Sequence, residues 1–147
     1  MHLTVRRYRR NLNIASNPAE DIPAQHVAML GALRRMRLGL LVGDLAEARV
    51  ARDVLQSLHA AHIALEETAL IPKLPGSARW SAKVYLAEHA KLSAMLGDWR
   101  EILAQQPDRI DPPEQRLTLL DASAPLQHLL EHHFEREEKG LLIETRR

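Results

Sequence analysis

Residues 82–103, which read AKVYLAEHAKLSAMLGDWREIL, decide the fold. Apolar side chains recur along this stretch at alternating steps of three and four residues, which is the spacing of one face of an α-helix. The members of this face are Ala82, Tyr85, His89, Leu92, Leu96, Trp99 and Leu103. His89 therefore belongs to the stripe that the helix buries.

Similar spacing predicts four helices in all, over residues 23–42, 45–70, 78–106 and 114–139. The connections between them are short, which is typical of neighbouring helices that run in opposite directions. The sequence therefore predicts an all-α fold, an antiparallel up-and-down four-helix bundle, over residues 22–147.

Prolines and small polar residues set the predicted helix ends. Pro23 fits the first turn of the first helix, Pro72 ends the second, and Ser77 can cap the third. Pro125 falls inside the fourth, so that helix is predicted either to kink or to begin later than residue 114.

Residues 1–21 show no clean period and contain four arginines at positions 6, 7, 9 and 10. We interpret this stretch as a solvated N-terminal arm. A nucleic-acid or membrane tether is the less favoured alternative, because short basic runs are weak motifs.

The composition narrows the class of protein. A chain of 147 residues with 46% hydrophobic and 27% charged residues suits one globular domain. A net charge of +1 gives no field that would favour nucleic acid or a membrane surface. The absence of cysteine excludes disulfides, cysteine-bound iron–sulfur clusters and thiolate zinc sites. With no apolar run long enough to cross a bilayer, a cytoplasmic location is expected.

The histidines carry the functional signal. His26 leads an apolar stripe in the first helix, and His62 and His133 lie on the apolar faces of the second and fourth. Glu66 and Glu137 follow these last two histidines by four residues, a spacing that places both side chains of each pair about 6 Å apart on one face. Each predicted helix thus sends a histidine inward, and two of them add a carboxylate.

A single core histidine is usually hydrogen-bonded to a neighbour, but four imidazoles and two carboxylates in one leucine-rich core need common partners. A metal centre satisfies all of them. Imidazole and carboxylate without thiolate suit iron, with manganese and zinc as less favoured choices. The other histidines, His2, His59, His128 and His132, are expected on the surface or outside the ligand set. Glu67 and Glu138 are expected to be charges at its rim.

The order His26, His62-x-x-x-Glu66, His89, His133-x-x-x-Glu137 resembles that of the hemerythrin and HHE cation-binding family. The resemblance covers about residues 22–143. It implies a non-haem centre of two iron ions, with Glu66 and Glu137 bridging the irons and the four histidines as terminal ligands. It also implies binding of oxygen or a related small ligand.

The chain differs from oxygen-carrying hemerythrins at two positions. Those proteins have two histidines four residues apart on the third helix, and the earlier position here is Tyr85. They also place the fourth-helix carboxylate five residues after its histidine, which makes Glu138 a rival of Glu137. Tyr85 is either a seventh ligand or a core tyrosine whose hydroxyl bonds a ligand carboxylate or points away.

Two classes of function follow. The first is a binding protein for oxygen or nitric oxide, used for sensing, storage or delivery. The second is a di-iron enzyme that consumes peroxide or reduces nitric oxide. We favour the first, because the sequence shows no additional acid or base aimed at the centre. A metal-free bundle that serves as an interaction domain is a third, less favoured interpretation.

Overall fold

The computed structural model describes residues 18–146, and over this range the chain is all-α, as the sequence predicts. These residues contain no β-strand, and the one β-bridge joins Asp44 and Arg109. The expected N-terminal arm lies outside the described residues up to position 17. Its last four positions, 18–21, form the start of the first described helix.

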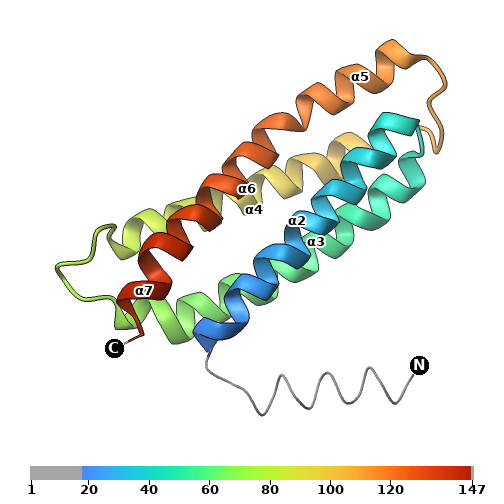
Figure 1. The fold of residues 1–147 in the computed structure, drawn as a ribbon. Coiled ribbons are helices and arrows are strands. Elements are labelled where there is room, and N and C mark those ends of the chain that lie inside the picture. Colours follow the sequence, from blue (N-terminus) through green and yellow to red (C-terminus); the bar gives the residue numbers. More distant parts are fainter. Residues whose placement is uncertain (1–17, 147) are drawn as a thin grey trace, which may run out of the picture.

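Helices α2 (Pro18–Val42) and α3 (Leu45–Leu65) lie side by side, joined by a tight turn (Figure 1). Gly43 has φ +78°, and a Cβ there would meet the carbonyl oxygen of Ile110, so only glycine fits this turn. Asp44 then caps α3 by accepting a hydrogen bond from the backbone N–H of Glu47 at 3.1 Å. Helix α2 begins five residues before the predicted start at Pro23, which lies inside the helix.

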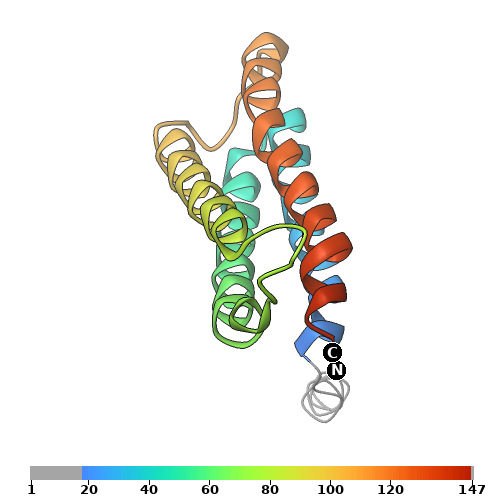
Figure 2. The ribbon, with the colours of Figure 1, turned by 90° about the vertical axis from the view of Figure 1, so that its left-hand side faces the viewer.

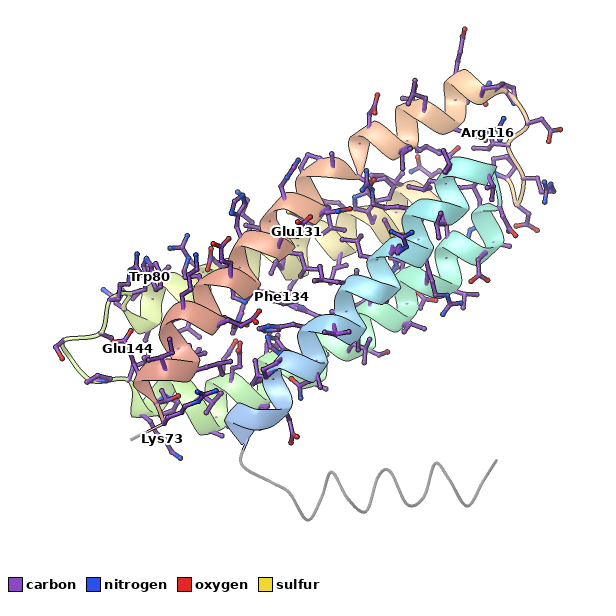
Figure 3. The ribbon with its side chains drawn as sticks, viewed as in Figure 1. Lys73, Trp80, Arg116, Glu131, Phe134 and Glu144 are labelled. Atoms are coloured by element: carbon purple, nitrogen blue, oxygen red, sulfur yellow. The ribbon has the colours of Figure 1, made fainter. Side chains whose placement is uncertain are left out.

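Helix α4 (Ala82–Ala104) begins later than the predicted residue 78, and the prediction that Ser77 caps it is wrong. The carboxylate of Glu144 accepts the backbone N–H of Arg79 at 3.1 Å, which holds the preceding segment against the end of the chain. Trp80 and Glu144 mark this junction in Figure 3. Helix α4 therefore begins at Ala82, after the segment that contacts Glu144.

The fourth predicted helix is two helices, α5 (Pro113–Ala122) and α6 (Ala124–Arg136), with the break at Ser123. Pro125 lies in the first turn of α6, where its missing N–H costs no hydrogen bond. Figure 1 shows α5, α6 and the short α7 (Leu142–Glu144) following one line. Figures 1 and 2 both place the start of α2 and the end of α7 at the same end of the molecule.

Two π-helical turns interrupt the helices at matching places: η1 (Glu66–Leu70) after α3 and η3 (Glu137–Leu141) after α6. In each, the carbonyl of the first glutamate accepts the N–H five residues later, from Ile71 and Leu142 respectively. Each thus holds one residue more than an α-helical turn. A short 3₁₀ segment, Ile71–Lys73, then ends the first of the two runs.

The buried apolar residues form two clusters. The larger runs along the helices and contains Met29, Leu40, Leu55, Leu92, Leu130 and neighbouring residues. The smaller consists of Ile22, Leu70, Ile71, Tyr85, Leu141 and Leu142. On every long helix the candidate histidine lies in sequence between a member of one cluster and a member of the other. Among the described residues no helix is long and apolar enough to cross a membrane.

Candidate metal centre

Four histidines from four helices turn their Nε2 atoms toward the carboxylate of Glu137, which is 0% exposed. Its Oε1 lies 2.7 Å from Nε2 of His26 and 3.0 Å from Nε2 of His62. Its Oε2 lies 2.9 Å from Nε2 of His133 and 3.4 Å from Nε2 of His89. The two oxygens of one carboxylate thus face two different pairs of imidazoles.

The ring positions show the same pairing. The centroids of His26 and His62 are 5.1 Å apart, and those of His89 and His133 are 4.9 Å apart. Between the pairs, the centroids of His62 and His89 are 6.3 Å apart. Phe134, labelled between α6 and α2 in Figure 3, stacks on the face of the His26 ring with a centroid distance of 3.9 Å and restricts its orientation.

Glu66 completes the cluster from the opposite side. Its Oε1 lies 2.8 Å from Nε2 of His89 and 3.2 Å from Nε2 of His62, so it contacts one ring of each pair. Its Oε2 is buried and has no hydrogen-bond partner. One donor atom from each of five buried residues lies within 4.8 Å of all the others: His62, Glu66, His89, His133 and Glu137. This group could hold a metal ion, and His26 adjoins it through Glu137.

The outer nitrogen, Nδ1, of each ring also has an oxygen partner. The four pairs are His26 with Glu138 at 3.0 Å, His62 with Gln25 at 2.8 Å, His89 with Glu67 at 2.8 Å, and His133 with Glu88 at 3.0 Å. These oxygens accept, so each Nδ1 donates, and a neutral ring is then left with a bare Nε2 lone pair facing inward. Metal-binding histidines in proteins have this arrangement.

The outer partners form a closed sequence around the molecule. Each is adjacent in the chain to a candidate ligand of its own helix, yet it holds the histidine of the next helix in chain order. Gln25 of α2 holds His62 of α3, and Glu67 of η1 holds His89 of α4. Glu88 of α4 holds His133 of α6, and Glu138 of η3 returns to His26 of α2. The placement of each ring therefore depends on two helices.

Glu137, not Glu138, is the fourth-helix carboxylate at the centre, because Glu138 is half exposed and contacts only the outer nitrogen of His26. Glu67 and Glu138 lie at the rim as expected, and each also fixes a ring there. Gln25 and Glu88 were not identified from the sequence. Their signal is their position directly before His26 and His89.

The charges in the cluster shift the pKa values of its members in opposite directions. Burial opposes a charge on His62 and His89, but Glu137 and Glu66 outweigh it and raise their pKa values to about 9 and about 10. Burial and the neighbouring Glu137 raise the pKa of Glu66. Burial also opposes ionisation of Glu137, but hydrogen bonds from Glu66, His133, His26 and His62 outweigh it and lower its pKa. Without metal, the cluster therefore retains protons that a cation would displace.

Tyr85 is fully buried one helical turn before His89, within the smaller apolar cluster. Burial, followed by the charge of Glu144, raises its pKa to about 12. The hydroxyl has no hydrogen-bond partner, so the expectation that it bonds a ligand carboxylate is not met. A Cβ at Gly140 would lie 2.6 Å from this hydroxyl and from the ring of Trp80, so glycine is required there.

Unpartnered buried atoms fit a missing cation. Buried polar groups nearly always have hydrogen-bond partners. Within residues 18–146, five buried side-chain atoms make no hydrogen bond of good geometry, and three of them belong to candidate ligands: Glu66 Oε2, Tyr85 Oη and His133 Nε2. Of these, His133 Nε2 still lies 2.9 Å from Glu137 Oε2. A metal ion at the cluster would give Glu66 and His133 a partner for these atoms. The residues present therefore fit a bound metal.

The remaining histidines divide. His128 and His132 are exposed, as the sequence predicts. His59 is not on the surface but lies outside the ligand set, the other position expected for it. It is 2% exposed, and its Nε2 is a fourth unpartnered atom. His2 lies outside the described residues. His59 is buried because α3 packs against both α2 and α4, so a residue about 60° away from the ligand face is covered as well.

Comparison with known proteins found no match to a protein-family model, to a curated protein or to a solved structure. Nitrogen and oxygen donors without sulfur suit iron, manganese or zinc.

Proposed function

We propose that this chain is a non-haem di-iron protein of the hemerythrin-like type, an antiparallel up-and-down four-helix bundle that binds oxygen or nitric oxide for sensing, storage or delivery. The observation that carries the proposal is the pairing at Glu137, whose two carboxylate oxygens face separate pairs of histidines. One ion with six ligands would leave no open position, whereas two ions share the same donors and leave some free.

In this proposal His26 and His62 serve one iron, and His89 and His133 serve the other. Glu137 and Glu66 would be shared by both ions, since each carboxylate contacts a histidine of both pairs. Tyr85 is the seventh ligand, on the side of His89, and its unpartnered hydroxyl supports this role. When bound, the irons supply coordination positions for a small ligand, while the surrounding side chains hold the donors and exclude water.

The nitrogen-rich set favours iron over manganese, because imidazole suits iron while manganese prefers oxygen ligands. Four imidazoles and two carboxylates carry less negative charge than the four-glutamate sites of ferritin-like bundles. Less anionic charge gives less stabilisation of highly oxidised iron, which favours reversible binding of a ligand over strong oxidation.

The alternative is a di-iron enzyme that consumes peroxide or reduces nitric oxide. One observation favours it: His59 is a buried imidazole beside the cluster without a partner of its own. Steady-state turnover of hydrogen peroxide by the iron-loaded protein separates the two functions. Sustained turnover would favour the enzyme, and stable binding without turnover would favour the carrier or sensor.

Metal analysis tests the proposal directly. Protein purified from iron-replete cells should contain close to two irons per chain and show the ultraviolet absorption of an oxidised iron pair. One zinc per chain, with no uptake of ferrous iron, would contradict it.

A further inference from the structure

His59 is the one buried histidine among the described residues that has no role in the donor set. It lies on α3, one turn before His62, and is 2% exposed. Its Nε2 is buried without a hydrogen-bond partner, whereas Nδ1 of each candidate ligand histidine has one. Buried polar atoms nearly always have a partner, so this nitrogen is free to bond a small molecule that enters beside it.

The surroundings of His59 point it toward the metal centre. Its ring meets that of His89 edge to face, with centroids 6.3 Å apart and an angle of 87°. No acidic side chain is paired with His59, in contrast to its neighbours. An uncharged imidazole has one nitrogen that donates a hydrogen bond and one that accepts one.

A hollow of about 80 Å³ opens beside His59 between α3 and α4. Its lining consists of Gln56, His59, Ala60, Ile63, Ser93 and Leu96. This volume exceeds the roughly 30 Å³ that a water molecule occupies in the liquid, and the polar lining residues supply hydrogen bonds for one. Of its lining residues, the buried His59 meets the ring of His89, so the hollow lies next to the cluster.

We propose that this hollow is the route by which a small ligand reaches the metal centre, and that His59 at its inner end hydrogen-bonds that ligand. The inference rests on the proposed di-iron function and names the side of the centre from which the ligand enters. The ligand class is a molecule of two or three heavy atoms with an acceptor atom, such as oxygen, nitric oxide or azide. His59 is thus a positioning residue for the ligand and not a metal ligand.

Azide binding to the oxidised, iron-loaded full chain tests the proposal by stopped-flow spectroscopy. His59→Phe keeps the ring but removes both nitrogens, and it should raise the azide dissociation rate about tenfold, the effect of losing one hydrogen bond. His59→Gln keeps a donor and an acceptor and should restore a rate near that of the parent. Ser93→Phe should fill the hollow and slow azide association. His128→Phe, exposed on α6, is the matched control and should change neither rate.

Iron content and melting temperature of each variant keep the outcomes distinct. A parent chain without two irons, or without azide binding, would overturn the proposed function and the inference with it. A parent that binds both, with azide rates unchanged in His59→Phe and Ser93→Phe, would overturn the inference alone. Loss of iron from a folded His59→Phe would also overturn it, because His59 would then be a ligand.

Discussion

The segments 62–71 and 133–142 share one sequence pattern, and the difference between them shows what the neighbouring helices add to that pattern. Both begin with a histidine, continue with two glutamates four and five residues later, and enter a π-helical turn at the first glutamate. Both end on buried apolar residues of the smaller cluster. Local sequence thus gives the two segments the same backbone.

The carboxylates of these segments nevertheless have different surroundings. Glu137 contacts four imidazoles through two oxygens, while Glu66 contacts two imidazoles through one oxygen and leaves the other unpartnered. The pKa of Glu137 is lowered and that of Glu66 is raised. The motif therefore supplies a buried carboxylate, and the neighbouring helices determine the direction in which its pKa shifts.

The largest expected effect comes from removing these carboxylates. Glu137→Ala should weaken iron binding by more than about 100-fold, since losing a residue that only supports a ligand already costs about 10- to 100-fold. Glu66→Ala should lose less iron, and His26→Ala less again, because it contacts one ion only. Metal analysis after gel filtration measures the order, with the exposed Glu131→Ala as control. Equal iron content in the three variants would refute the bridging assignment.

Metal removal should lower the melting temperature, and the gap should depend on pH. The protons on His62 and His89 stabilise the metal-free fold fully below pH 6.5. That contribution is lost as the pH rises through about 9 and about 10, the raised pKa values of the two rings. Iron must displace the same protons, so its affinity rises over this interval. Thermal melts should show the gap between loaded and metal-free protein widening from pH 6.5 to 9.

The exposed His128→Gln should retain this widening, since that ring lies away from the cluster on α6. A gap that stayed constant between these pH values would show that His62 and His89 do not release protons to the metal.

Removing an outer carboxylate should weaken iron binding less, and by different amounts for the two segments. Glu67 belongs to the first segment, and Glu88 holds His133 of the second. Glu88 is 15% exposed and also pairs with Arg136 at 3.2 Å, whereas Glu67 is 39% exposed. Glu88→Gln should therefore lower iron affinity by about tenfold, and Glu67→Gln by less, because solvent weakens the exposed contact. Competition with a chelator measures both constants. A larger loss in Glu67→Gln would reverse this ranking.

The smallest effect on iron content is expected from Tyr85→Phe, because six other ligands remain. The effect on the spectrum should be large, since a phenolate on ferric iron absorbs in the visible range. The oxidised parent should be purple to blue and the variant should lose that band. Tyr85→His would place two histidines four residues apart on α4 and should lengthen the lifetime of the oxygen adduct. A parent without the visible band would make Tyr85 an ordinary core residue.

Helical spacing was sufficient to predict the all-α fold and the inward direction of His26, His62, His89 and His133, because a 3.6-residue period fixes which side chains share a face. It could not choose between Glu137 and Glu138, since neighbours in sequence differ by about 100° and the π-helical turn changes the register just there. That choice required the position of α2, which supplies His26.

The outer partners were beyond prediction for a different reason. Gln25 and Glu88 act on rings of other helices, so their roles depend on the rotation of two helices at once. The sequence left His59 either on the surface or outside the ligand set, and the choice depended on α3 packing against two neighbouring helices. The start of α4 was misjudged because a contact remote in sequence, from Arg79 to Glu144, holds the chain before the helix.

The two π-helical turns change which side of the helix the following side chains face. Each inserts one residue, so the side chains that follow are rotated by about 100° relative to an uninterrupted helix. The histidine and the glutamate of each segment precede the extra residue and keep their direction on the helix. The apolar residues after it are rotated relative to them: Leu70, Ile71, Leu141 and Leu142. Converting the π-helical turn to an α-helical one without removing a residue would leave the spacing of His62 and Glu66 intact while rotating Leu70 and Ile71 away from their cluster. Because of the extra residue, one continuous helical run can direct both its metal-binding side chains and the apolar residues that follow them into the protein interior.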